Sequence, residues 1–343
     1  MWFPDKFLAI AIDGGTTNTR ARLVRGDRIL ATARRSVGAR TTVLEASRSP
    51  LAAGIRDAVL EAAAAARGER IELVTAAGML GSEAGLIAVP HVDAPAGIAE
   101  LARGIVVYRE PIGLDQPVVV VPGVKTPPAQ GPKGWIEADV MRGEECETLG
   151  ARLLLDRDRP DREKAAETYV WPGSHTKIVH VNLSGKITSS FTTLAGEFTS
   201  AIAKHTLISS SLPIDWPETL DHDSVRLGME ACRHDGLGRA AFLVRIAALQ
   251  GNLDANQRFA FWLGGVVESD VASVAARIDR TPSKRIWIGG REPLRSLYAE
   301  RLTEALGSSV SILSDDVADR AAAIGAAAVA WTANRPDQPI APN

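Results

Sequence analysis

One stretch near the start, residues 13–19 (Asp-Gly-Gly-Thr-Thr-Asn-Thr), restricts what this 343-residue chain can fold into more than any other. An apolar run from Phe7 to Ile12 precedes it and is typical of a buried strand, and strand-like alternation resumes at Arg20. The polar stretch is therefore predicted to be the tip of a hairpin. Its glycines let the backbone approach a ligand closely, and its N–H groups and hydroxyls can surround phosphate oxygens.

Asp13 ends the first predicted strand, where its carboxylate can hold a metal ion. Mg²⁺ keeps much of its hydration in proteins, so the contact is expected either directly or through water. The alternative is a carboxylate that caps a turn through the backbone of an ordinary Gly-rich hairpin. The density of glycine and threonine favours the phosphate site over that alternative.

Length and composition indicate two domains, each with its own core. A net charge of −2 lacks the basic footprint of proteins that bind nucleic acids or anionic membranes. Cys146 and Cys232 lie far apart and form no metal-ligand pattern, which suits a reducing compartment. The N-terminus has no signal-peptide pattern, and the run from Ala321 to Ala330 is too short to span a bilayer. We therefore expect a soluble, cytoplasmic protein.

The opening pattern returns in the second half of the chain. A strand at 168–171 leads to a polar loop at 172–177 (Pro-Gly-Ser-His-Thr-Lys), and strands follow on either side of a turn at Gly185. The separation from Gly173 to Gly185 differs by one residue from that between Gly15 and the turn at Gly26. We interpret this similarity as an internal duplication with a period near half the chain.

Periodicity and turn signals predict the remaining elements. The small-residue loop at 76–82 follows a strand, at the sheet edge where α/β proteins bind ligands. The expected helices cover 50–66, a segment ending near 155, most of 196–276, a segment after Pro293, and 317–331, and the further strands cover 71–75, 118–121, 285–288 and 310–313.

Two hairpins with polar tips can contact the phosphates of ATP from both sides, and a strand that ends in Gly289-Gly290 can cover the adenosine. The chain resembles the actin-like ATPase and sugar-kinase superfamily: residues 13–19 resemble its first phosphate motif and 172–177 its second. Residues 288–290 resemble its adenosine motif, and 318–327 its connecting helix. The resemblance implies an α/β fold of two duplicated ribonuclease H-like domains with a cleft between them. The implied boundaries are 1–156 for the first domain, 157–316 for the second, and 317–343 for the connecting helix and tail.

Within that superfamily the chain is most similar to the 2-dehydro-3-deoxygalactonokinase family. The similarity rests on residues 78–82, 141–145, 172–177 and 191–197. It implies transfer of the ATP γ-phosphate to the 6-hydroxyl of 2-dehydro-3-deoxy-D-galactonate in D-galactonate catabolism, with Mg²⁺ as the metal. The partners are then ATP and a small sugar acid, without nucleic acid or membrane. The sequence leaves open the epimer at C4 and a homodimer.

The resemblance also implies roles for individual residues in nucleotide binding. Asp13 is the expected metal ligand and part of the catalytic set. His175 can instead be a plain hydrogen-bonding loop residue, and Arg291 a solvated residue at a helix start. The expected nucleotide-binding residues are Gly14, Gly15, Thr16, Thr17, Asn18, Gly173, Ser174, His175, Thr176, Gly289, Gly290 and Arg291.

A kinase of this type needs a carboxylate that accepts a proton while the substrate oxygen attacks phosphorus. Related sugar kinases place an acid directly after a glycine at the start of the helix that links the domains, and Gly143-Glu144 fits that position. Glu144 is therefore the expected base, with Glu145 and Asp139 as rivals. In the alternative, the paired glutamates only stabilise the positive end of a helix, an effect of about 0.3–1 kcal/mol.

A 2-keto acid needs a cationic or N–H-rich site for its carboxylate. Arg142 and Lys125 lie just past predicted strand ends, and an arginine suits a two-point clamp. Gly81 and Ser82 are expected to bind hydroxyls or the carboxylate through main-chain N–H groups. Alternatively, Arg142 is an ion-pair partner of a nearby acid, Glu137 or Asp139.

Three other hypotheses remain open. A kinase of the same fold that acts on an N-acetylhexosamine or a pentulose would not need Arg142 or Lys125. A non-enzymatic ATP-driven clamp or filament protein usually carries larger insertions than this chain. A Rossmann enzyme would need Gly-x-Gly-x-x-Gly between a strand and a helix, whereas the opening loop here leads into a strand.

Overall fold

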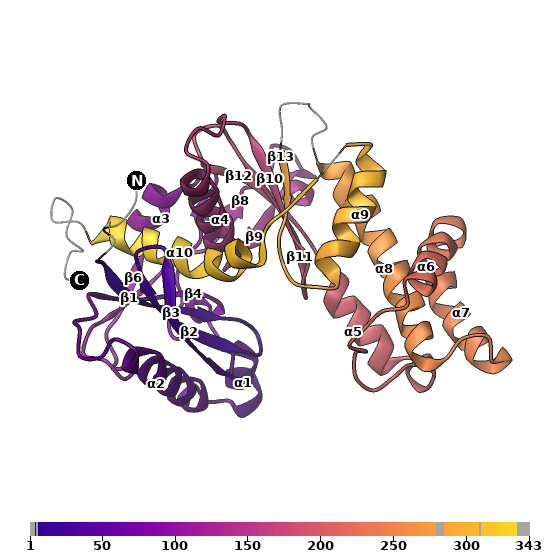
Figure 1. The fold of residues 1–343 in the computed structure, drawn as a ribbon, viewed down its shortest axis with the longest axis horizontal. Helices are drawn as coiled ribbons and strands as arrows, with labels where there is room; N and C mark the ends of the chain where they lie inside the picture. Colours follow the sequence, from indigo (N-terminus) through magenta and orange to yellow (C-terminus); the bar gives the residue numbers. More distant parts are fainter. Residues whose placement is uncertain (1–3, 5, 279–284, 309, 335–343) are drawn as a thin grey trace. The chain divides into compact units, whose positions relative to one another are not determined.

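The computed structural model describes residue 4 and residues 6–278, 285–308 and 310–334 (Figure 1). Packing divides the chain into two compact units. Unit 1 consists of residues 1–166, 179–190 and 314–343, and unit 2 consists of residues 167–178 and 191–313. The domain boundaries expected from the sequence, after residues 156 and 316, stay predictions.

The first sheet is built around the predicted hairpin. Its central strand β1 pairs antiparallel with β2 and parallel with β4, and Gly14 lies opposite Thr19, so residues 15–18 form the tip. β2 pairs antiparallel with β3, β4 parallel with β7, and β7 antiparallel with β6. The strand order is β3 (Arg28–Arg35), β2 (Thr19–Arg25), β1 (Leu8–Gly14), β4 (Leu73–Gly78), β7 (Val118–Val120) and β6 (Val106–Tyr108).

The second sheet repeats the order of the first four strands. Its strands are arranged as β12 (Ile187–Thr193), β11 (Thr176–Val181), β10 (Glu167–Trp171), β13 (Arg285–Ile288) and β14 (Ser311–Ile312). β13 pairs parallel with both β10 and β14. In both sheets the third, second, first and fourth strands lie side by side in that order, as the internal duplication predicts; the next strand is the sixth of the first sheet (β7) but the fifth of the second (β14). A small third sheet contains β5 (Val92–Asp93), β8 (Val124–Thr126) and β9 (Asp139–Met141).

Helices cover both faces of the first sheet in unit 1 (Figure 1). Helix α2 (Ser49–Ala64) packs its apolar stripe on β1 to β3, because Leu51 and Ile55 meet Ile10 and Leu23 in one buried cluster. Helix α10 (Asp315–Ala333) covers the other face, and α4 (Glu144–Asp158) packs on α10. The remaining helices of the unit are α1 (Ala39–Glu45) and α3 (Ile98–Arg103).

Small residues bring α4 and α10 into close contact. A Cβ added to Gly150 would lie 1.9 Å from the carbonyl oxygen of Ala321, and one added to Gly325 would lie 2.0 Å from that of Cys146. The Ala-rich sequence of α10 is therefore explained by helix packing in the core of unit 1, since larger side chains would separate the two backbones.

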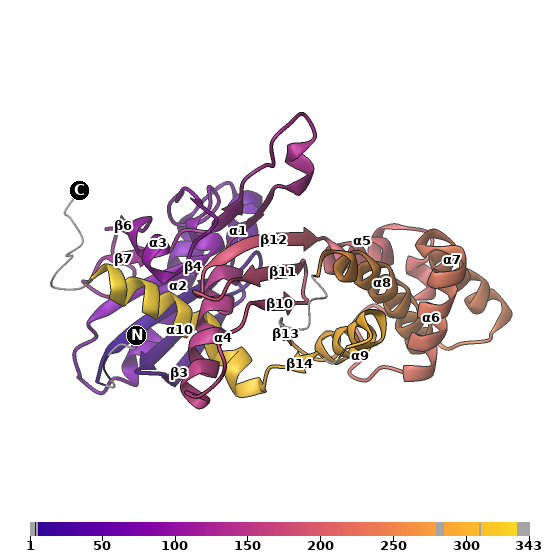
Figure 2. The same cartoon turned by 90° about the horizontal axis from the view of Figure 1, so that it is seen from above.

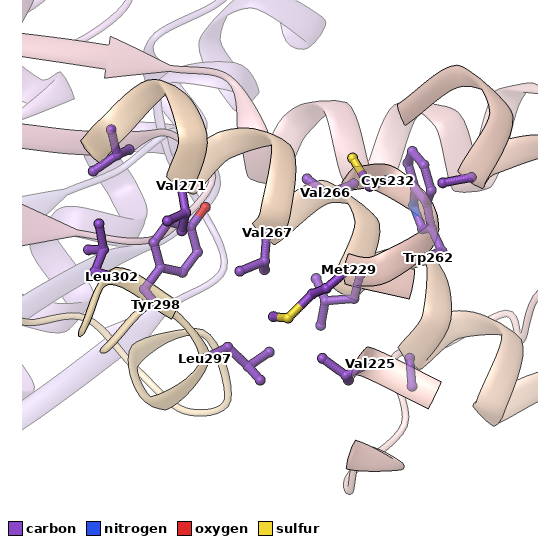
Figure 3. Packing of buried hydrophobic residues seen from close by; sticks show 14 of the residues in the cluster. Val225, Met229, Cys232, Trp262, Val266, Val267, Val271, Leu297, Tyr298 and Leu302 are labelled. Atoms are coloured by element: carbon purple, nitrogen blue, oxygen red, sulfur yellow. The ribbon is translucent and has the colours of Figure 1, made fainter. Parts of the chain in front are cut away.

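Unit 2 is largely helical, as expected for residues 196–276. Figure 2 shows α6 (His222–Asp235), α7 (Leu237–Gln250) and α8 (Ala255–Arg277) packed together, with α5 (Ala195–His205) and α9 (Leu294–Leu306) against α8. Met229, Trp262 and Tyr298 contribute to its buried cluster (Figure 3). Helix α8 is long and apolar enough to cross a bilayer, but 78% of its apolar window is buried within the protein, as in a core helix.

Candidate active site

The first predicted phosphate loop, residues 14–19, is held in place by its own backbone and by α1. The N–H of Gly15 donates to the carbonyl of Asn18 at 2.8 Å, and the N–H of Arg40 at the start of α1 donates to the carbonyl of Thr16 at 2.9 Å. A Cβ added to Gly38 would lie 2.5 Å from the same carbonyl, so only glycine permits this approach. Thr16, Thr17 and Asn18 are exposed, which leaves their polar groups available to a ligand.

Asp13 lies where three backbone turns of unit 1 meet. Its carboxylate is partly exposed and lies 3.6 Å from a guanidinium nitrogen of Arg20. At the end of β4, Gly78 has a φ of 72°, and an added Cβ would lie 2.5 Å from the carbonyl oxygen of Gly14. A Cβ on Gly143, just before α4, would lie 3.4 Å from the Cα of Gly78. The ends of β1 and β4 and the start of α4 therefore converge beside Asp13 with no bulky side chain between them.

The donor set around Asp13 suits a weakly ligated, hydrated ion. Within the described residues, no three His, Cys, Asp or Glu side chains form a metal-binding group. Mg²⁺ is commonly bound through one or two carboxylates, with water and substrate phosphates as its other ligands. One carboxylate at a strand end, next to a loop of free N–H and hydroxyl groups, fits that requirement.

The two glutamates at the start of α4 differ in surroundings. Both side-chain oxygens of Glu145 accept from the N–H of Gly143, at 2.9 and 2.8 Å, and the side chain is fully buried. Burial and the neighbouring Glu144 carboxylate raise the pKa of Glu145 to about 8. Glu144 is half-buried, and one of its oxygens accepts from the N–H of Arg142 at 3.2 Å. Glu145 thus caps its own helix, while Glu144 keeps part of its carboxylate accessible. The other rival, Asp139, lies in β9 and is half-buried.

Arg142 has a guanidinium nitrogen with no partner. Its Nη2 donates to the carbonyl of Val89 at 2.7 Å and lies 3.3 Å from Nδ1 of His91, rather than pairing with Glu137 or Asp139. Its Nη1 is buried and has no hydrogen bond to any described residue. A Cβ added to Gly81 would lie 2.8 Å from this nitrogen, so the guanidinium lies directly against the loop that follows β4.

The other two predicted substrate residues are engaged within the protein. Lys125 is exposed, and its Nζ lies 3.3 Å from a carboxylate oxygen of Asp93. The hydroxyl of Ser82 donates to the carbonyl of Met79 at 2.7 Å. The structure therefore brings Gly81 and Arg142 together, and gives Lys125 and Ser82 local partners.

In unit 2, the second predicted phosphate loop rests on the start of α5. A Cβ on Gly196 would lie 2.2 Å from the carbonyl oxygen of Gly173, and the N–H of Glu197 donates to the carbonyl of Ser174 at 2.9 Å. The Nε2 of His175 lies 3.4 Å from a carboxylate oxygen of Glu197. Residues 191–197 therefore form the surface against which this loop packs. This contact explains why the two motifs occur together in one sequence.

A buried network that the sequence did not reveal supports the same loop. Thr176 is 1% exposed, and its hydroxyl lies 3.0 Å from that of Tyr298, which in turn donates to Asp270. Burial and the Asp270 carboxylate raise the pKa of Tyr298 well above its ordinary value, so its hydroxyl stays protonated. Figure 3 shows Tyr298 among apolar side chains. The three residues are too far apart in the sequence for any local pattern to connect them.

The predicted adenosine turn of unit 2 packs on the end of β10. A Cβ on Gly289 would lie 2.0 Å from the indole ring of Trp171. Gly290 has a φ of 80°, and an added Cβ would lie 2.7 Å from the carbonyl oxygen of Pro172. Two segments expected to bind nucleotide, 172–176 and 289–291, are therefore adjacent, and Arg291 beside them is exposed.

Replacing Gly289 by Ala is expected to destabilise the protein, because the new methyl group overlaps a buried indole. Overpacking of this kind typically costs about 1–3 kcal/mol. The check is the thermal unfolding midpoint, with Gly238→Ala as the control: no atom lies within 4 Å of a Cβ at Gly238 in α7, so its midpoint should stay equal or rise. Equal midpoints for Gly289→Ala and the wild type would contradict the packing described for the turn.

Comparison with known families gives one model that spans most of the chain. The model, described as 2-keto-3-deoxy-galactonokinase, matches residues 13–329. The 2-dehydro-3-deoxygalactonokinase of Escherichia coli (strain K12) is 28% identical over 317 residues, which cover 91% of this chain and 94% of that protein.

Solved structures show similar folds. A protein of Sinorhizobium meliloti, named as a candidate 2-dehydro-3-deoxygalactonokinase, superimposes with a TM-score of 0.73 at 24% identity and covers 98% of both chains. Component A of the (R)-2-hydroxyglutaryl-CoA dehydratase of Acidaminococcus fermentans has a TM-score of 0.51 at 17% identity, covering 96% of this chain and all of that one. At these identities the likeness concerns the fold alone.

Proposed function

Because the chain belongs to the 2-keto-3-deoxy-galactonokinase family, we propose that it transfers the γ-phosphate of ATP to the 6-hydroxyl of 2-dehydro-3-deoxy-D-galactonate, in D-galactonate catabolism. The family expected from the motifs is confirmed, as are the α/β fold class and the assignment to the kinases. The choice of substrate, the roles of individual residues, Mg²⁺ and the cytoplasmic location belong to the proposal.

The observation that carries the proposal is the unpartnered nitrogen of Arg142 beside Gly81. A buried polar group without a hydrogen bond is unfavourable, and a substrate carboxylate would supply a charge-assisted one. A hydroxyl of a neutral sugar can accept from this nitrogen but carries no opposite charge, whereas a carboxylate supplies both, so this nitrogen favours a sugar acid. The Val89 carbonyl holds the other guanidinium nitrogen in place, which orients the free one.

The convergence at Asp13 supports the expected phosphate chemistry. Asp13 would hold Mg²⁺, directly or through water, and the ion would neutralise the charge that spreads over the phosphoryl oxygens. Glu144 would accept the proton of the attacking hydroxyl, since part of its carboxylate is accessible while that of Glu145 caps the helix. The N–H groups and hydroxyls of residues 14–18 in unit 1, and of 173–176 in unit 2, would bind the phosphates.

The proposal is tested by measuring ADP release over a panel of sugars and sugar acids, and by locating the phosphate in the product through ³¹P–¹H coupling. We expect turnover with 2-dehydro-3-deoxy-D-galactonate, slower turnover with its gluconate epimer, and a 6-phosphate product. Strong turnover with N-acetylhexosamines or pentuloses, and none with 2-keto-3-deoxy acids, would replace this assignment with another kinase of the same fold.

A further inference from the structure

A second polar pocket lies in unit 1, beside the edge strand β3 and the first turns of α10. Its volume is about 400 Å³, within the range of pockets that bind small molecules. Arg22 reaches it from β2, where it lies opposite Thr32 of β3, another lining residue. The charged residues that line the pocket are Arg22, Arg28, Arg34, Asp316, Asp319 and Arg320.

This pocket is separate from the candidate active site. β3 forms one edge of the first sheet, whereas the loop that carries Gly81 follows β4, on the other side of β1, and Gly143 follows β9 of the third sheet. None of its lining residues is among those proposed to bind ATP or the sugar acid. The reaction proposed above therefore leaves the charges of this pocket unexplained.

One arginine of the pocket is neutralised by the protein itself. Nη1 of Arg320 donates to the carbonyl oxygen of Asp27 at 3.0 Å and to its carboxylate at 3.1 Å, and the same guanidinium pairs with Asp316. Asp27 also pairs with Arg157. These contacts fix the wall of the pocket on the α10 side. They leave Asp319 as a lining carboxylate without an ion pair to any residue that the structure describes.

Arg22 is a buried cation without a hydrogen bond. Only 5% of the residue is exposed, and its guanidinium forms no hydrogen bond or ion pair within the described ranges. Burial lowers its pKa, but an arginine stays protonated in a protein, so the charge persists. The carboxylates of Asp13, Asp319 and Glu147 favour the charged form without an ion pair to it. A buried charge with no partner is strongly unfavourable, so a bound anion would stabilise it.

Two more arginines stand at the same pocket. Arg28 and Arg34 are exposed on β3, and their side chains have no ion pair among the residues that the structure covers. Three unpaired guanidinium groups against one unpaired carboxylate leave an excess of two positive charges. A phosphate monoester carries a charge of about −1.5 to −2 at pH 7 and offers the oxygen geometry that arginines bind at two points.

We propose that this pocket binds a small anion that carries a phosphate group, either inorganic phosphate or the phosphate ester of a sugar acid. Arg22 is the buried anchor of the site, and Arg28 and Arg34 bind the anion from its solvent side. This pocket and the active site have no lining residue in common, so both can be occupied at the same time.

The test is calorimetric titration of the full chain with inorganic phosphate, 6-phosphogluconate or gluconate. Mg²⁺ and a non-hydrolysable ATP analogue are present throughout, so that the predicted nucleotide site is occupied. We expect both phosphate-bearing probes to bind and gluconate to fail. Tighter binding of 6-phosphogluconate than of phosphate identifies an ester as the natural ligand, and the reverse identifies free phosphate.

Three variants decide whether the binding belongs to this pocket. Arg22→Met should weaken it at least tenfold, and so should the double variant Arg28→Gln with Arg34→Gln, which alters only exposed side chains and leaves the core intact. The matched control is Arg35→Gln: Arg35 is the next residue on β3, pairs with Glu61 and does not line the pocket, so binding should be unchanged. Absence of binding to the wild type, equal binding of gluconate, or binding that survives the double variant would overturn the proposal.

Discussion

Glu144→Gln is expected to lower kcat by about 10²–10⁴, the range for loss of a general base, with KM for both substrates nearly unchanged. Glutamine keeps the size of the side chain and an oxygen that can accept from the N–H of Arg142, so the helix start is preserved. What it loses is the ability to take the proton of the attacking hydroxyl. The measurement is steady-state kinetics at saturating ATP and sugar acid.

Glu145→Gln is the matched control for that result. Glu145 has a pKa raised to about 8, so at pH 7 it is largely protonated and already resembles the amide. Its oxygens are also occupied by the N–H of Gly143. We therefore expect kcat of this variant to stay close to that of the wild type.

A near-normal rate for Glu144→Gln would mean that Glu145 or Asp139 accepts the proton. The rate of Asp139→Asn would then show which of these two residues does so.

Arg142→Lys is expected to lower kcat/KM for the sugar acid by about 10–150-fold, since a hydrogen bond to a charged group is worth about 1.5–3 kcal/mol. A lysine has a single ammonium group and cannot hold the Val89 carbonyl and a substrate carboxylate in the fork geometry of a guanidinium. KM for ATP should be unchanged, because the lost contact is to the sugar acid alone.

Lys125→Met discriminates between the two basic residues expected at the substrate carboxylate. Lys125 is exposed and lies beside Asp93, so its removal should have a small effect on kcat/KM. A larger loss for Lys125→Met than for Arg142→Lys would assign the carboxylate to Lys125.

Equal losses of sugar-acid and ATP binding in Arg142→Lys would mean that this arginine only supports the structure.

Local sequence patterns account for the parts of the structure that could be predicted. The hairpins at residues 8–25 and 167–181 were predictable because alternating patterns, polar tips and the Gly turns that follow them occur in consecutive residues. The loop after β4 and the acid after Gly143 were found in the same way. The convergence of Gly14, Gly78 and Gly143 was not predictable, because it depends on three chain turns that meet only after the sheet has formed.

The sequence by itself determined the family, the repeat of the opening hairpin and the candidate phosphate loops, since each follows from short runs of residues with specific backbone requirements. Only the tertiary structure decided which of two adjacent glutamates is buried as a helix cap and which nitrogen of Arg142 lacks a partner. It also decided that Arg22 is buried without a counter-ion. The physical reason is that burial and hydrogen bonding are properties of neighbours in space, and packing brings those neighbours from distant parts of the chain.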